Sequence, residues 1–330
     1  MQGERFRRRK ASDIALNPQT NHFSTRRRFC ATGTFFLPSM PRLDRLAALY
    51  LTSPLVQLFG PRRGSRVPVL MYHSISHNLF GRSHPYYQIN TLPSVFSEQM
   101  RDLRSEGYRT VGLSEAWAGL STGEDLSKTV VLAFGEGYRD FYTDALEVLT
   151  QCGFTATVFL VTSRIRKNSL CIEGADYLTW EEVKQCQKAG IQFGSRTVTH
   201  PDLRSMSPEQ IEYELGHSKE VIEQQLGVSV DSFSYPFAFP EEDKHFARFL
   251  EDVLENIGFE YGVSTILGRA HRKSRKLFLP QLPVNSWDDS ALLHAKLMGG
   301  YDWLHWAQFV KRSMLHHPTL MQEGTGGIRV

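Results

Sequence analysis

From Val67 onward, short apolar runs of strand length alternate with amphipathic stretches that repeat at helical spacing. The runs predicted as buried strands are VPVLMYH at 67–73, TVVLAF at 129–134, TATVFLV at 155–161, IQFGS at 191–195, SFSYP at 232–236, YGVST at 261–265 and FLPQLPV at 278–284. The stretches predicted as helices are 93–106, 137–150, 179–189, 207–226 and 243–257, followed by a helical tail over 290–315. This alternation is typical of a parallel α/β sheet or barrel.

Two of the predicted helices carry clear start signals. Thr179 precedes the acids Glu181 and Glu182, and Ser207 precedes Pro208. A Ser or Thr side chain caps the first free N–H groups of a helix, and proline is well tolerated at the first helical position. These signals place the start of each helix to within a residue or two.

The first 66 residues differ in charge from the rest of the chain. They hold 13 Lys and Arg against three acids, a net of +10, whereas the remainder holds 25 basic and 32 acidic residues. We predict that residues 1–40 form a basic leader, disordered or used for targeting, and that 41–66 form a helical lead-in. The run Thr25-Arg26-Arg27-Arg28-Phe29 is similar to a twin-arginine export signal. The sequence leaves export or envelope association open and assigns no compartment.

The apolar segment 46–60 is shorter than the ~18–20 residues that a membrane-spanning helix needs, and Pro54 interrupts it. It suits an amphipathic helix, either on a membrane surface or packed on the globular body. We favour packing on the body, so membrane association through 41–60 stands as the alternative. The mildly acidic body argues against a nucleic-acid partner.

The four cysteines, Cys30, Cys152, Cys171 and Cys186, form no CxxC pair. This spacing argues against a zinc knuckle or a redox motif. We expect partly buried free thiols, and one or two disulfides remain open as the other reading.

Polar residues that could take part in catalysis or metal binding follow three of the predicted strands. The stretches are AFGEGY at 133–138, FGSRTVTHPDL at 193–203 and FSYPFAFPE at 233–241. The carboxyl ends of parallel strands in a barrel meet at one face, where barrel enzymes place their active sites. Glu136 and His200 are the obvious metal-ligand types among these residues.

With VLMYHSIS at 69–76 and LPQLPVNSWDD at 279–289, these stretches resemble the polysaccharide deacetylases, the NodB-homology family also called carbohydrate esterase family 4. The resemblance runs from about 67 to 289 and implies an irregular parallel (β/α) barrel, with 290–330 as a helical extension and tail. It also implies removal of acetyl groups from N-acetylglucosamine in glycans such as chitin or peptidoglycan. The family uses a divalent metal, often zinc.

This sequence departs from the family pattern at its most important positions. The family reads Thr-Phe-Asp-Asp-Gly where this chain reads Ala133 to Gly137, so Gly135 stands at the general base and Glu136 at a metal ligand. The family's paired histidines become Arg196 and His200. Glycine cannot accept a proton, and a guanidinium cannot ligate a cation. We expect the Arg196 guanidinium to lie within salt-bridge distance of Glu136, with which it could form a bidentate fork, or of the cavity that a metal would fill.

The remaining motifs supply expected groove residues. The resemblance places Tyr235, Pro236 and Phe237 in a wall of the sugar groove, and we add Tyr138 and His73 as candidates for substrate binding. Gln281 replaces the arginine that would steady the missing carboxylate at 135. The family's late catalytic histidine is not assigned, and the candidates are His271, His294 and His305.

The family resemblance and the individual site residues therefore predict different functions. Family membership implies a metal-dependent amide hydrolase that acts on or binds an N-acetylglucosamine-type glycan. The residues predict that no catalytic set is intact, that metal is absent or weakly bound, and that N-deacetylation is lost. The alternative is a catalytically silent protein that binds carbohydrate or protein in polysaccharide or cell-envelope metabolism.

Overall fold

The computed structural model describes residues 43–59, 65–77, 90–166, 171–172 and 175–315. The chain divides into two compact units, 1–41 and 42–330, and every described residue belongs to the second. The predicted leader at 1–40 and Cys30 lie outside the described residues. Cys152 and Cys186 are buried free thiols, as expected.

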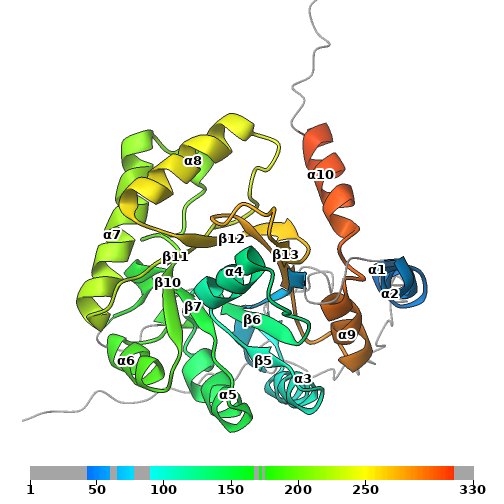
Figure 1. The fold of residues 1–330 in the computed structure, drawn as a ribbon. Helices are drawn as coiled ribbons and strands as arrows, with labels where there is room; N and C mark the ends of the chain where they lie inside the picture. The colour runs from blue at the N-terminus through cyan, green and yellow to red at the C-terminus, as the bar shows by residue number, and fades with distance from the viewer. Residues whose placement is uncertain (1–42, 60–64, 78–89, 167–170, 173–174, 316–330) are drawn as a thin grey trace, which may run out of the picture. The chain divides into compact units, whose positions relative to one another are not determined.

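Seven parallel strands close into a barrel at the centre of the fold (Figure 1). In ring order they are β2 (Val69–Tyr72), β14 (Leu279–Pro283), β12 (Tyr261–Leu267), β11 (Ser232–Ser234), β10 (Gln192–Ser195), β7 (Thr157–Leu160) and β6 (Thr129–Phe134), and β6 pairs with β2 to complete the ring. A short strand, β5 (Arg109–Thr110), extends from β6. The predicted α/β barrel of the NodB type is confirmed.

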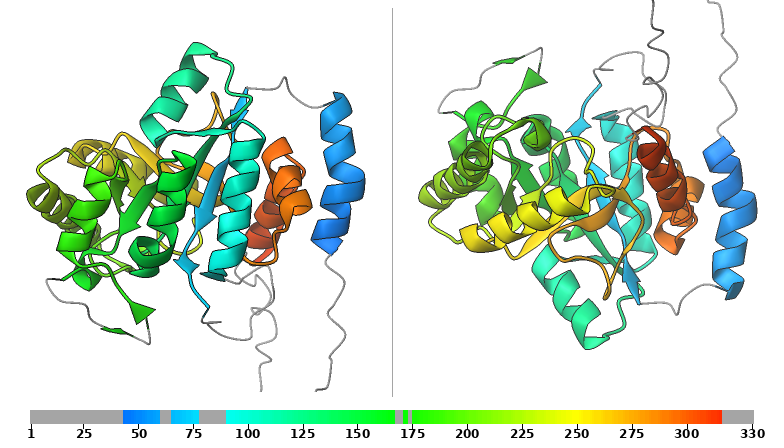
Figure 2. Two further views of the ribbon diagram at one scale, coloured as in Figure 1. Left: turned by 90° about the horizontal axis from the view of Figure 1, so that it is seen from below. Right: turned by 90° about the horizontal axis from the view of Figure 1, so that it is seen from above.

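Helices cover the outside of the barrel (Figures 1 and 2). They are α3 (Pro93–Ser105), α4 (Leu113–Thr122), α5 (Leu146–Cys152), α6 (Trp180–Lys188), α7 (Pro208–Leu226), α8 (Lys244–Ile257), α9 (Ser290–Met298) and α10 (Leu304–Leu315). There are also three short helices, η3 (Phe141–Ala145), η4 (Thr162–Arg164) and η5 (Leu203–Ser205). Short strands outside the barrel form pairs: β1 (Arg66–Val67) with β13 (Ala270–His271), β3 (Ser74–Ile75) with β4 (Asn90–Thr91), and β8 (Cys171–Ile172) with β9 (Ala175–Asp176).

The helix predictions differ from the structure in three places. Helix α4 was not predicted, although Leu113, Ala116, Trp117 and Leu120 recur at helical spacing in its sequence. The helix after β6 begins four residues later than predicted and opens with a π-helical turn, η3. The predicted tail breaks between α9 and α10, where Gly299 adopts a left-handed conformation with φ of 96°. The capping boxes at Thr179 and Ser207 are present.

Alternating residues of the strands divide the core in two. One face of the barrel strands forms a cluster that includes Val69, Val131, Ala133, Val263 and Leu279, whereas the other face packs against the helices. Because side chains alternate along a strand, Gly135 continues the face of Val131 and Ala133 at the carboxyl end of β6. The interior face therefore leads directly to the motif residues.

Three further segments precede the barrel: α1 (Leu43–Leu46), the π-helical η1 (Ala47–Thr52) and α2 (Ser53–Phe59). Together they form one helical stretch, called here the lead-in helix. It lies beside α9 in both views of Figure 2 and contacts it. Within the described residues, no helix has the length and apolar character needed to cross a membrane.

Candidate functional site

The three motif stretches share an unusual backbone. Among the described residues, four non-glycine residues have positive φ: Glu136 (73°), Thr197 (66°), His200 (63°) and Phe237 (54°). All four follow the carboxyl ends of β6, β10 and β11. A non-glycine residue in this left-handed region costs on the order of 1–3 kcal/mol, and such residues cluster at functional sites. The backbone thus marks the barrel mouth independently of side-chain chemistry.

Glu136 lies at the centre of the site with its side chain 13% exposed. Its Oε2 accepts hydrogen bonds from Arg164 Nη1 at 2.8 Å and from the Tyr138 hydroxyl at 3.0 Å. Burial acts to raise the pKa of Glu136, but Arg196, the two histidines and Arg164 outweigh it and lower that pKa to about 2. Glu136 is therefore an anion at neutral pH.

Arg196 is 4% exposed and fills the mouth of the barrel. Its Nε donates to His200 Nε2 at 3.0 Å, and its Nη1 donates to the Ser234 hydroxyl at 3.1 Å. The expected fork between Arg196 and Glu136 is not formed among the described residues, because the short ion pair of Glu136 is with Arg164. Arg196 acts on Glu136 through its charge rather than through a direct bond.

The guanidinium of Arg196 also occupies the space above Gly135. A Cβ added at Gly135 would lie 2.9 Å from Arg196 Nη1 and 3.0 Å from His73 Cδ2. Both distances are too short for normal contacts, so any side chain at 135 requires Arg196 or His73 to move. The absence of a base at 135 and the presence of arginine at 196 are thus sterically coupled.

The two histidines of the site are neutral. Burial lowers the pKa of His200 and of His73 to about 4 each, and Arg196 adds to both shifts. The geometry at His200 agrees, because its Nε2 accepts a hydrogen bond and cannot carry a proton there. The 4.0 Å approach of that nitrogen to Glu136 Oε1 is therefore not an ion pair. Arg164, Arg196 and Glu136 leave the cluster with one net positive charge.

Three residues of this site were not found from the sequence. Arg164 ends η4 after β7, and Ser234 ends β11. Glu214, on α7, accepts from the backbone N–H groups of Val198 and Thr199 at 2.8 and 2.9 Å and from the Thr199 hydroxyl at 2.8 Å. Arg164 and Glu214 stand outside the quoted motif stretches, and Ser234 lies within FSYPFAFPE at 233–241 but was not singled out. For Glu214, the sequence offered one weak signal, because this glutamate stands among the apolar residues Ile211 and Leu215 of the helix predicted at 207–226.

The predicted groove residues divide into buried and accessible ones. Tyr235 and Pro236 are buried, and Tyr235 packs edge-on against Phe239, so they support the mouth rather than line a surface. Phe237 is 54% exposed, and its ring lies 4.6 Å from the ring of His200. Tyr138 is partly exposed and stacks on Tyr177. His73 lies partly buried beside Gly135.

Gln281 is buried, and its Oε1 has no hydrogen-bond partner among the described residues. It stands two residues after Leu279 on β14 and so continues the interior face of the barrel. The three candidate late histidines lie elsewhere. His294 faces Glu106 at 3.3 Å, and His305 faces Glu241 at 2.9 Å.

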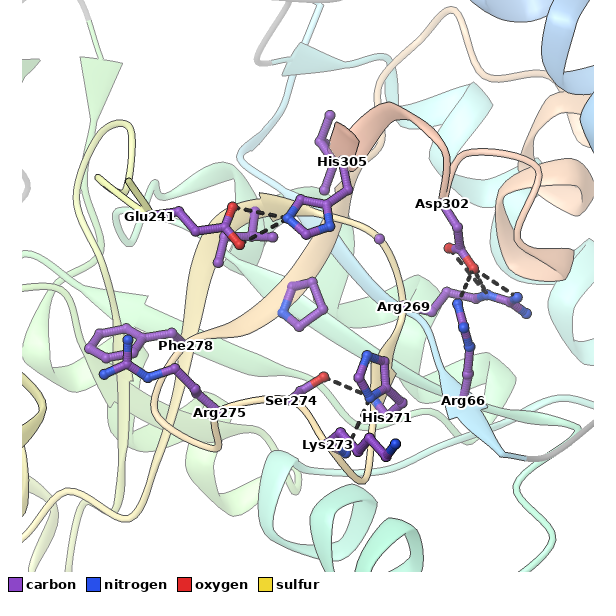
Figure 3. A pocket seen from close by; sticks show the side chains of 14 residues that line it. Arg66, Glu241, Arg269, His271, Lys273, Ser274, Arg275, Phe278, Asp302 and His305 are labelled. Atoms are coloured by element: carbon purple, nitrogen blue, oxygen red, sulfur yellow. Dashed lines mark hydrogen bonds and ion pairs between the residues drawn. The ribbon is translucent and has the colours of Figure 1, made fainter. Parts of the chain in front are cut away.

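His271 and His305 line a cavity of about 260 Å³ beside β12 and α10 (Figure 3). Three of its charged groups are paired, because Asp302 accepts from Arg66 at 2.7 Å and from Arg269 at 3.0 Å. Figure 3 shows Arg66, Arg269 and Asp302 together on one side of the cavity and Glu241 with His305 on another. None of the lining residues is a hydrogen-bond partner of Glu136 or Arg196 in the described chain. This cavity is therefore separate from the barrel mouth.

A metal site requires several ligating side chains at one point. No group of three His, Cys, Asp or Glu side chains in the described part of the chain is placed to hold a metal ion. At the barrel mouth, Glu136 and His200 are the two positions that keep ligating side chains from the resemblance, and Arg196 lies between His200 and Ser234.

Known proteins share both the sequence and the fold. A family model described as polysaccharide deacetylase matches residues 122–261. The Bacillus subtilis (strain 168) protein named "Putative polysaccharide deacetylase YxkH" is 31% identical over 225 residues, which cover 67% of this chain and 72% of that protein. A poly-beta-1,6-N-acetyl-D-glucosamine N-deacetylase of Staphylococcus aureus is 22% identical over 223 residues, covering 64% and 72% of the two chains.

The fold agrees with these sequence matches. The solved structure of the Streptococcus pyogenes deacetylase PplD in complex with acetate superposes with a TM-score of 0.61. It is 24% identical and covers 70% of this chain and 98% of its own, so the likeness concerns the fold alone. The sequence relatives, the matched family model and the barrel lead to one conclusion. The chain belongs to the polysaccharide deacetylase family.

Proposed function

We propose that this chain binds an N-acetylglucosamine-type glycan at its barrel mouth and does not carry out metal-dependent N-deacetylation. The observation that carries the proposal is the position of Arg196. Its guanidinium bonds His200 and Ser234 and occupies the space that a side chain at position 135 would need. One residue thus fills the region in which the reaction would take place.

The residues at the mouth do not fit the divalent metal that this family generally uses. A catalytic zinc site holds the ion through three protein ligands, whereas the mouth offers Glu136 and His200. The lone pair of His200 Nε2 accepts from Arg196 Nε, and Glu136 Oε2 is bonded to Arg164 and Tyr138. The cluster already has a net positive charge of one, which opposes a dication.

The glycan part of the proposal rests on the exposed aromatic ring at the mouth. Phe237 presents a flat apolar face to solvent while His200 supports its other side. A fixed aromatic face of this kind suits the apolar face of a pyranose ring. The Staphylococcus aureus relative is named for its action on poly-beta-1,6-N-acetyl-D-glucosamine, and this name supplies the first ligand to test.

The experiment combines three measurements on the full chain: binding of β-1,6-linked N-acetylglucosamine oligomers by calorimetry, acetate release with and without added zinc, and bound zinc by elemental analysis. We expect binding, no acetate and no stoichiometric zinc.

Phe237→Ala should weaken binding about tenfold, since a stacked aromatic face contributes on the order of 1 kcal/mol. Tyr213→Ala, which removes an exposed ring on α7, is the matched control. Stoichiometric zinc together with acetate release that Glu136→Ala abolishes would overturn the proposal.

A gain-of-function variant tests the same site from the other direction. Gly135→Asp, Glu136→Asp and Arg196→His restore the family's residues, and Gln281→Arg supplies a partner for the new carboxylate. The structure requires these changes together, because a side chain at 135 collides with Arg196. We expect the combined variant to bind zinc and each single variant not to, since three ligands are needed. A folded combined variant without zinc would show that the site assignment is wrong.

A further inference from the structure

The lead-in helix (43–59) turns its small and polar side toward the protein. Ala48 and Ser53 are buried against Gly300, where an added Cβ would lie 2.5 Å from Ser53 Oγ. The exposed large apolar residues of this helix are Leu43, Leu46, Tyr50, Leu51, Leu55 and Leu58. A helix on the surface of a water-soluble protein buries its large apolar side chains and exposes its polar ones. The lead-in helix does the opposite.

Hydrogen bonds along the helix fix this orientation. Arg45 donates to both carboxylate oxygens of Asp289 at 2.9 and 2.7 Å, and the Tyr301 hydroxyl donates to Asp44 at 2.6 Å. The Thr52 hydroxyl donates to the backbone oxygen of Gly300 at 2.6 Å. These contacts lie on the packed side, in the first turn at Asp44 and Arg45 and near the middle of the segment at Thr52. Rotation of the helix to hide its leucines would break all of them.

Large apolar side chains are exposed on the lead-in helix and also on a second helix. Tyr50 is 76% exposed and Leu58 is 75% exposed. Tyr301, which contacts the lead-in helix, stands directly before α10, whose segment adds exposed Trp303, Trp306 and Val310. Figure 2 shows α10 and the lead-in helix on the same side of the barrel in both views. Large apolar side chains exposed together on one helix of a folded domain mark an interaction site.

The charge of the surrounding sequence identifies the partner. No acidic residue stands between Asp44 and Glu98, and Arg62, Arg63 and Arg66 follow the helix. Residues 1–66 carry 13 basic and three acidic residues, so two copies of this chain would each bring the same excess of positive charge. Basic residues beside an exposed apolar helix face, with tryptophans nearby, are typical of a helix that lies in the interface of an anionic membrane.

We propose that the lead-in helix and the start of α10 form a docking surface for an anionic lipid bilayer. The helix has segments of 4, 6 and 7 residues and contains Pro54, so it lies along the membrane surface and does not cross it. The leucines and Tyr50 enter the acyl boundary, and the basic excess of residues 1–66 attracts anionic headgroups. The packing on the globular body that we predicted from the sequence explains why the side with Ala48 and Ser53 is buried. It does not explain why the leucines are exposed. The proposal is independent of glycan binding.

The test is co-sedimentation of the full chain with vesicles of phosphatidylcholine alone or with 30% phosphatidylglycerol. We expect binding to the anionic vesicles that high salt weakens without abolishing. The variant Tyr50→Gln/Leu51→Gln/Leu58→Gln keeps helix propensity and should reduce binding on the order of a hundredfold. The control Tyr213→Gln/Val228→Gln removes exposed apolar groups elsewhere and should bind like the unchanged protein. Circular dichroism and melting curves check that both variants fold.

Three outcomes would overturn the proposal. The first is equal vesicle binding by the triple variant and the unchanged protein, which would mean that the basic residues alone attract the vesicles. The second is a concentration-dependent dimer by light scattering that the triple variant abolishes, with no vesicle binding, which would assign the surface to a second copy. The third is a monomer that binds neither vesicle.

Discussion

At the scale of single residues, the barrel mouth is a set of substitutions that depend on one another. Arg196 needs an acceptor and finds it in neutral His200, and its charge is balanced by Glu136. Burial lowers the pKa of Arg196 and Glu136 raises it again, so the pair stays ionised inside the barrel. Gly135 leaves the room that the guanidinium occupies. A substitution at any one of these residues therefore changes the contacts or the charge of its neighbours.

This coupling gives a prediction for Gly135. Gly135→Ala should lower the free energy of unfolding by about 2 kcal/mol, because the new Cβ displaces Arg196 from its hydrogen bonds. In an Arg196→Ala background the same change should cost about 1 kcal/mol less, as a double-mutant cycle of urea unfolding would measure. Gly216→Ala on α7, where a Cβ meets nothing within 4 Å, is the control and should be neutral or stabilising. Additive costs at 135 and 196 would contradict the steric account.

At the scale of elements, α7 holds the second motif in its strained conformation. Glu214 is buried on the helix face toward β10 and accepts three hydrogen bonds from Val198 and Thr199. The two positive-φ residues Thr197 and His200 flank those positions. A helix on the outside of the barrel thus determines where His200 and Arg196 lie inside it.

We therefore expect Glu214→Ala to destabilise the protein by about 2–3 kcal/mol, since two backbone N–H groups lose a charged, buried acceptor. Hydrogen exchange should accelerate at 197–200 more than in the barrel strands. Glu212→Ala, at an exposed position two residues earlier on the same helix, should change neither quantity. Unchanged exchange at 197–200 in Glu214→Ala would mean that the turn is held by other contacts.

At the scale of the whole molecule, stability should depend on pH through the buried site. His73 and His200 have folded pKa values of about 4, below the ordinary value of 6.5. Between these values the unfolded chain binds protons that the folded chain does not, so the free energy of unfolding falls as pH falls from 6.5 to 4. Glu136, with a pKa lowered from 4.5 to about 2, extends the loss below pH 4.5. Asp140, raised from 3.8 to about 6 chiefly by burial, acts in the opposite direction.

The measurement is urea unfolding at pH 7, 5.5 and 4.5 for the unchanged chain and for His73→Gln/His200→Gln. Each histidine contributes at most about 1.4 kcal/mol per pH unit, so the double variant should show a clearly flatter dependence. His217→Gln, at an exposed site on α7, should keep the original slope. An equal slope in the double variant would show that other groups control the acid response.

The sequence by itself determined the barrel, because strand and helix periods are local properties that burial on one or two faces imposes. It also identified the motif positions, including Gly135, Glu136, Arg196 and His200, since these stand at fixed places after strands. It missed α4, although Leu113, Ala116, Trp117 and Leu120 recur there at helical spacing.

The tertiary structure alone decided which groups meet. Arg164, Glu214 and Ser234 come from other elements, and their contacts depend on how strands and helices are arranged around the barrel. The expected Arg196–Glu136 fork failed for the same reason, because spacing along the chain does not say which of two arginines is nearer. The orientation of the lead-in helix was likewise invisible in its sequence. Its leucines indicate an apolar face, but only the contacts of Asp44, Arg45 and Thr52 with distant residues turn that face outward.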